Sequence, residues 1–148
     1  MREIKWSVYL SGEIHTLWRE QIKKGIDFAQ LPIESMSPIT DHESSDNCGS
    51  HILGDENNDF WKDHKGAKLN AIRNKTLLQN ADIIIVKFGD KYRQWNAAFD
   101  AGYAVASDIP LITLHNSELN HALKEIDAAA LAVAETTDQI INILHYIS

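Results

Sequence analysis

The sequence predicts an α/β fold of the flavodoxin-like kind, a three-layer sandwich with a parallel sheet between two layers of helices. Three observations predict it. Apolar strand-like runs alternate with segments of helical periodicity along the whole chain. The run DIIIVKF at 82–88 is continuously apolar, which is typical of a strand buried on both faces. The length of 148 residues fits one domain over 1–148, with a Rossmann-like sheet of about five strands in the order 2-1-3-4-5.

The expected strands are apolar or β-branched runs bounded by glycine, proline or polar residues. The first run, IKWSVYLSG, ends in a glycine, and the second is weaker because prolines confine it to an edge of the sheet. We expect strands at 4–12, 31–39, 82–88, 109–115 and 129–135.

The expected helices are segments in which apolar residues recur at every third or fourth position. They are expected at 13–29, 66–81, 93–108, 117–126 and 136–148. Ser117 begins the fourth of these helices as an N-cap, and Thr136 or Thr137 begins the last.

Residues 40–65 interrupt this alternation with a long polar insertion, TDHESSDNCGSHILGDENNDFWKDHK. We expect a loop or lid over the binding cleft, because a structureless segment of this length is uncommon unless it is functional. Its acids and histidines raise the possibility of a metal site, but they lack HxxxH, HExxH or regular oxygen spacing. We therefore expect no metal and no cofactor.

Composition excludes several classes of function. The formal charge of −7 and the scattered lysines and arginines argue against a nucleic-acid partner. No apolar run of about 18 residues is present, and no signal peptide is recognised at the start, so we expect no membrane partner and a cytoplasmic location. Cys48 is the only cysteine, which leaves no intrachain disulfide and no cysteine metal cluster.

Ligands of such sheets bind at the carboxyl ends of the strands, at the switch point between strands 1 and 3. The first strand ends in SGEIH and the third is followed by GDKYRQWN. A glycine here lets the backbone approach a ligand, while His15 is more often a surface or packing histidine. Trp95 could stack on a base, cap the core or fill a subunit interface, and Asp46 could bind a hydroxyl or cap a helix. The expected substrate-binding residues are Ser11, Gly12, Glu13, Gly89, Asp90, Trp95, Asn96 and Asp46.

The segment FDAGYAVA at 99–106 places a carboxylate, Asp100, in a helix that is apolar nearly all round and is therefore expected to be buried. A buried carboxylate is costly unless it is paired or hydrogen-bonded. Two interpretations are open. Asp100 is either bonded structurally to its surroundings, or it forms the floor of the cleft as a nucleophile or base.

Three segments resemble the nucleoside 2-deoxyribosyltransferase superfamily in order and spacing: VYLSGEI, NADIIIVKFG and AAFDAGYAVASDIPLITL. Within it, QWNAAFDAGYA and SSDNCG resemble the YtoQ family. The resemblance covers most of the chain. It implies the same Rossmann-like fold, a nucleoside or nucleotide as substrate, and a homo-oligomer, a dimer or higher, in which a neighbouring subunit completes the site.

The resemblance also implies catalytic roles. In the transferases a glutamate attacks the anomeric carbon and a tyrosine on the first strand hydrogen-bonds it; by motif, Asp100 and Tyr9 stand at these positions. Departures from the pattern are the shorter Asp100, and amides at Gln94 and Asn74 where acids are common. The expected function is N-glycosidic bond chemistry, by transfer or hydrolysis. The alternative is a catalytically inactive protein that binds nucleosides or nucleotides in a regulatory role.

Overall fold

The computed structural model of the chain describes residues 2–148, except for the side chain of His42. The strands are β1 (Trp6–Gly12), β2 (Ile33–Met36), β3 (Ile83–Lys87), β4 (Leu111–Leu114) and β5 (Ala132–Ala134). The helices are α1 (Trp18–Phe28), α2 (His42–Leu53), α3 (Asp59–Asn80), α4 (Trp95–Ala106), the 3₁₀ turn η1 (Ser117–Leu119), α5 (Lys124–Ala129) and α6 (Thr137–Ile147). Within the described residues, none of the helices combines the length and hydropathy needed to cross a membrane.

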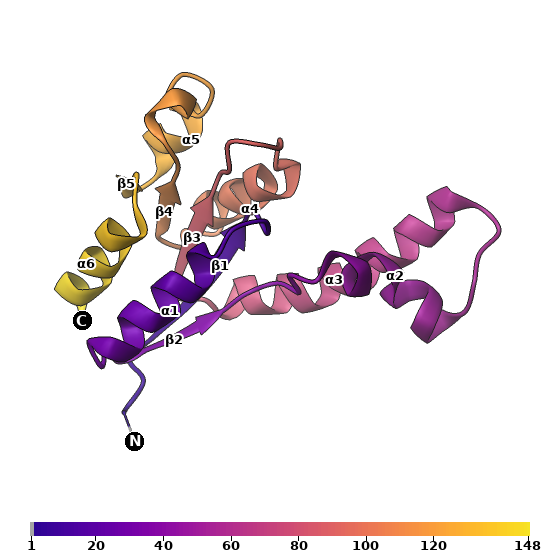
Figure 1. Cartoon of the computed structure of the whole chain (residues 1–148), viewed down its shortest axis with the longest axis horizontal. Helices are drawn as coiled ribbons and strands as arrows, with labels where there is room; N and C mark the ends of the chain where they lie inside the picture. The colour runs from indigo at the N-terminus through magenta and orange to yellow at the C-terminus, as the bar shows by residue number, and fades with distance from the viewer. Residues whose placement is uncertain (1) are drawn as a thin grey trace.

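The five strands form one sheet in the order β2-β1-β3-β4-β5, and every neighbouring pair is parallel (Figure 1). This confirms the predicted fold class and strand order. The order reverses between β1 and β3, where Gly12 lies opposite Lys87 at the carboxyl ends of the two strands. The switch point is therefore where the sequence predicts a binding cleft.

The core has two layers, one on each face of the sheet. Strand residues alternate between them, so Val8 and Leu10 pack with α1 and α6, while Tyr9 packs with α3 and α4. On α4 the small residues Ala97, Ala101 and Ala104 are buried and let this helix approach the sheet closely. Because side chains alternate, residues 9 and 11 of β1 both face α4.

The largest difference from the sequence-based expectation is the segment 40–65, here called the arm, which is mainly helical. It forms α2 and the start of α3, and it projects from the body of the molecule as a helical hairpin (Figure 1). Glycines allow the close packing: a Cβ added to Gly49 would lie 2.6 Å from Lys65 Cβ, and one on Gly66 would lie 3.0 Å from the carbonyl oxygen of Asp46.

Two helix boundaries also differ. The helix expected at 13–29 begins only at Trp18, because residues 13–17 form a loop held by the Glu13 side chain. The helix expected at 117–126 is divided into η1 and α5.

One of the two predicted helix caps is found in the structure, and the other is replaced by a neighbouring residue. Asn116, rather than Ser117, caps η1 by accepting from the backbone N–H of Glu118 at 2.8 Å. Thr136 caps α6 as predicted and forms a capping box with Gln139.

Candidate active site

Asp100 lies on the side of α4 that faces the end of β1. The Ser11 hydroxyl on β1 donates a hydrogen bond of 2.5 Å to Asp100 Oδ2. Burial raises the pKa of Asp100, while the Ser11 bond acts in the opposite direction by favouring the carboxylate. The carboxylate is thus partly desolvated and held at one oxygen, which is the arrangement that the nucleophile interpretation requires.

Tyr9 also lies close to Asp100 but is fully buried. Its hydroxyl has no hydrogen-bond partner among the residues that the structure describes. Burial, followed by the negative charge of Asp100, raises the pKa of Tyr9 above its usual range, so the phenol stays neutral. A buried hydroxyl without a partner is uncommon. It leaves an unused hydrogen-bond donor close to the carboxylate.

Replacing Ser11 with alanine should raise the pKa of Asp100 further, because the bond that favours the ionised form is lost. The pKa can be followed by ¹³C NMR titration of the aspartate carboxyl groups, assigned with an Asp100→Asn variant. Ser107→Ala, at the exposed end of α4, is the matched control and should leave the pKa unchanged. An unchanged or lowered pKa in Ser11→Ala would show that Ser11 does not hold the carboxylate.

The loop between β1 and α1 is built around Gly12 and Glu13. Gly12 has a φ of 116°, and a Cβ there would lie 2.0 Å from the carbonyl oxygen of Lys87. The buried Glu13 carboxylate accepts from the backbone N–H groups of His15, at 2.7 Å, and Thr16, at 3.1 Å, and from the Thr16 hydroxyl. The oxygens of Glu13 are therefore engaged in shaping the loop, although a free acceptor for a substrate was expected there.

The side chain of Arg19, on α1, also holds this loop in place. Its buried guanidinium donates to the carbonyl oxygens of Leu10, Gly12 and Glu13 at 3.0, 3.2 and 2.6 Å. Burial lowers the pKa of Arg19 to about 10, which leaves it protonated at neutral pH. Nothing in the sequence distinguishes this arginine from a surface residue of an amphipathic helix, and sequence reasoning missed it.

Two adjoining hollows open at this edge of the sheet. The loop hollow, of about 330 Å³, lies between the β1–α1 loop, the start of the arm and the loop before α4, and is lined by Gly12, Glu13, His15, Asp46 and Tyr92 among others. The Asp100 hollow, of about 440 Å³, lies between α3 and α4 and is lined by Asp100, Phe99 and Tyr103 among others. Both are lined by the side chains of Asn70, Asn74 and Asn96. A ligand that spans the three asparagines would therefore reach both hollows.

The three asparagines differ in their hydrogen bonds. Asn70 donates to the carbonyl oxygen and the hydroxyl of Ser45, at 2.9 and 3.1 Å, and so ties α3 to the arm. Within the described residues, the side-chain amides of Asn74 and Asn96 make no hydrogen bond and remain available to a ligand. Asn70 was missed by sequence reasoning, and the spacing of Asn70 and Asn74, four residues apart on one helix face, is the signal that could have found it.

Five expected site residues do not line either hollow. Ser11 is one of them, because it is buried beneath Asp100, to which its hydroxyl donates. Tyr9 lies beneath the surface, and Gly89 lies against Glu13 with its N–H donated to Gln94 Oε1 at 3.0 Å. Trp95 is 73% exposed, with the Arg93 guanidinium 5.8 Å from its ring centroid. The Asp90 carboxylate accepts from the side chain of Asn116.

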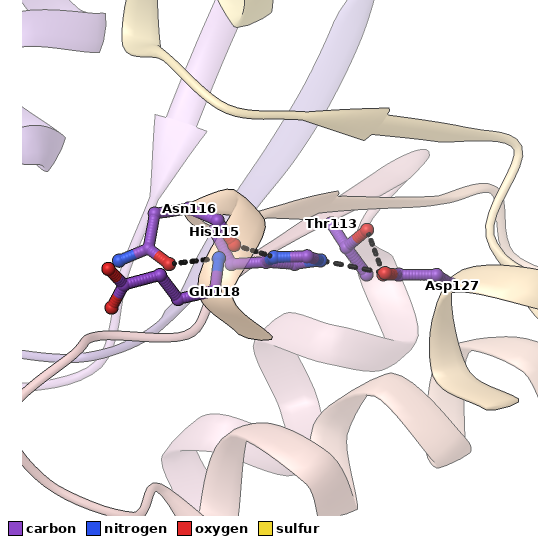
Figure 2. Close-up of polar contacts among 5 residues, drawn as sticks. All are labelled: Thr113, His115, Asn116, Glu118 and Asp127. Carbon is purple, nitrogen blue, oxygen red and sulfur yellow. Dashed lines mark hydrogen bonds and ion pairs between the residues drawn. The ribbon is translucent and has the colours of Figure 1, made fainter. Parts of the chain in front are cut away.

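The cluster that fixes Asn116 lies at the end of β4 (Figure 2). His115 is buried, with Nδ1 2.7 Å from the carbonyl oxygen of Asn116 and Nε2 2.7 Å from Asp127 Oδ2. The Thr113 hydroxyl donates to the other oxygen of Asp127 at 2.8 Å. This cluster joins β4 to α5 and, through Asn116, holds Asp90 at the rim of the sheet rather than in the hollows.

Comparisons with known proteins agree with this architecture. Residues 9–148 match the model of the family described as nucleoside 2-deoxyribosyltransferase YtoQ. The chain is 42% identical over 144 residues to the uncharacterized protein YtoQ of Bacillus subtilis (strain 168), covering 97% of each chain.

Two solved structures share the fold at low sequence identity. A conserved protein from Enterococcus faecalis V583 has a TM-score of 0.62 at 12% identity, over 97% of this chain and 99% of that one. A 2-deoxyribosyltransferase from Bacillus psychrosaccharolyticus has a TM-score of 0.56 at 17% identity, over 92% and 90% of the two chains. The family model matches nearly the whole sequence, and the Bacillus subtilis protein is 42% identical along it. The chain therefore belongs to the nucleoside 2-deoxyribosyltransferase YtoQ family.

Proposed function

We propose that the protein breaks the N-glycosidic bond of a nucleoside or nucleotide, with Asp100 as the nucleophile. The observation that carries the proposal is the Asp100 carboxylate, which is partly desolvated, held at one oxygen by Ser11 and open to a hollow of about 440 Å³. Perturbed carboxylates beside a cavity are typical of catalytic groups. Membership of the YtoQ family and the shared fold with a 2-deoxyribosyltransferase support sugar transfer as the reaction class.

In the proposed mechanism an oxygen of Asp100 attacks the anomeric carbon while the bond to the base breaks, and the bond's electron pair leaves with the base. The positive charge that develops on the sugar is stabilised by the carboxylate. The resulting glycosyl ester is then opened at the anomeric carbon by a second base or by water, which returns the carboxylate. Ser11 holds Oδ2 and leaves Oδ1 for the attack, and Tyr9 lies close enough to orient the carboxylate by its unpartnered hydroxyl.

Substrate binding in this proposal uses both hollows. Asn74 and Asn96 offer free amides to the sugar hydroxyls, next to Asp100. Gly12, Asp46 and Tyr92 enclose the loop hollow, which takes the base. The arm, through Asp46, serves as a lid over this hollow.

A second subunit completes the site in the proposed assembly. Ile72, Trp95 and Phe99 are exposed on α3 and α4 beside the Asp100 hollow, at 66%, 73% and 74% of their surfaces. The proposal places these exposed apolar side chains at the subunit contact. Their burial in a homo-oligomer would also exclude water from the reacting carboxylate.

The test is release of free base, followed by chromatography, from 2′-deoxynucleosides, ribonucleosides and their 5′-monophosphates, with and without a second base as acceptor. We expect base release from at least one class, and none from the same substrate with Asp100→Asn. If no substrate releases base while one of them raises the melting temperature and keeps its N-glycosidic bond, the protein is a binding protein instead. The shorter side chain at Asp100 favours that second candidate.

A further inference from the structure

The proposed function leaves one chemical requirement unassigned. A base that leaves with the electron pair of the N-glycosidic bond is a poor leaving group unless it receives a proton, so a general acid normally takes part. Asp100 is already engaged as the nucleophile. Two other carboxylates near the site, those of Glu13 and Asp90, are engaged elsewhere. Glu13 is bonded within its own loop, and Asp90 is bonded to Asn116 at the rim of the sheet.

His15 lines the loop hollow, to which the proposed function assigns the base. It was expected in the first turn of a helix, but it sits in the β1–α1 loop, is exposed, and lines the loop hollow. Its ring centroid is 4.7 Å from that of Tyr92, which lines the same hollow from the opposite loop. The imidazole nitrogens make no hydrogen bond within the described residues. A planar base beside these two rings would meet a free N–H donor.

The backbone fixes His15 in this place. Its N–H donates to the Glu13 carboxylate at 2.7 Å, and the Glu13 carbonyl oxygen accepts from Arg19 at 2.6 Å and from Trp18 Nε1 at 2.9 Å. Glu13 and Arg19 are both buried. The exposed imidazole is therefore carried by a rigid loop, which a positioned proton donor requires.

Resting on the proposed function, we propose that His15 is the general acid that protonates the leaving base. As Asp100 bonds to the anomeric carbon and the bond to the base breaks, the imidazolium N–H proton passes to a ring nitrogen or an oxygen of the base, and the base leaves neutral. The imidazole that remains can then take a proton from the incoming base or water in the second half of the reaction. Histidine as a residue type suits both roles because it exchanges protons readily near neutral pH, whereas a guanidinium group does not.

The experiment compares two leaving groups in His15→Gln. With 2′-deoxyguanosine the base needs a proton, whereas 7-methyl-2′-deoxyguanosine carries a positive purine ring and leaves neutral without one. The variant should release guanine about 10²- to 10⁴-fold more slowly than the parent protein, with release of 7-methylguanine changed by less than about threefold. His145→Gln, exposed on α6 at the far face of the sheet, is the matched control and should leave both rates unchanged. Asp100→Asn should lower both rates.

Several results would overturn the assignment. Equal losses on the two substrates would show a binding or structural role for His15, and unchanged rates on both would show no role. Selective loss of guanine release in Asp46→Asn rather than in His15→Gln would assign the acid to Asp46. A parent protein that cleaves only the methylated substrate has the nucleophile without the acid. One that releases base from none of the nucleosides and nucleotides of the first test contradicts the proposed function itself. Melting curves verify folding, and His15→Asn replaces any variant that does not fold.

Discussion

Asp100→Asn should lower base release on the order of 10⁴-fold, the effect expected when a residue that forms the covalent bond is removed. The carboxamide keeps the volume of the side chain and can still accept the Ser11 hydrogen bond, but it cannot form the glycosyl ester. Binding of an unreactive nucleoside should change much less, because most ligand contacts come from the two hollows. The measurement is turnover, together with the dissociation constant, for parent and variant.

The same substitution separates catalysis from stability. Burial raises the pKa of Asp100, so the folded state opposes ionisation, and the ionised carboxylate costs stability at pH values above its folded pKa. We therefore expect Asp100→Asn to melt a few degrees higher at neutral pH. This advantage should shrink as the pH falls, because Asp100 itself is then protonated in the folded protein. Melting curves over a pH series check this, and a variant less stable at every pH would assign Asp100 to a structural hydrogen-bond network.

Gly12→Ala has the largest expected effect on stability, a loss on the order of 3 kcal/mol or more. The new Cβ would lie 2.0 Å from the Lys87 carbonyl oxygen, and the φ of 116° is strained for any residue with a side chain. Gly54→Ala is the matched control, because Gly54 has a φ of 93° but open space around it. It should therefore show only the backbone cost of this conformation, about 1–3 kcal/mol. Urea unfolding measures both, and equal losses would show that the contact with β3 is not the cause.

The fold was predictable because the burial of each strand and helix leaves its own pattern of apolar residues in the sequence. The run at 82–88 is apolar on both faces since β3 is the central strand of the sheet, and the alternation of strands and helices leaves few topologies. The arm was not predictable by the same means. Its helices pack through Gly49 and Gly66 rather than through an apolar stripe, so no helical periodicity marks them.

The residues at the candidate site were predictable where the motif and the position on a strand or helix agree. They were not predictable where the direction of a side chain decides whether it reaches a hollow. Gly12 follows from the end of β1, and Asn96 and Asp100 lie four residues apart on one face of α4. The structure places all three at the hollows. Trp95 immediately precedes Asn96 yet points to solvent, because successive residues of a helix face different directions. Glu13 is taken up by backbone N–H groups of its own loop, a local competition that residue type alone does not reveal.

The central claim is that Asp100 forms a covalent bond with the sugar, and trapping that bond tests it most directly. A 2′-deoxy-2′-fluoroarabinosyl nucleoside slows both steps, because fluorine disfavours the positive charge on the sugar, and it allows the ester to accumulate. Intact-protein mass spectrometry should then show the mass of one fluorosugar added to the chain. Peptide mapping should place it on Asp100, and Asp100→Asn should not be labelled. Base release without an adduct, or an adduct on any other residue, would contradict the account.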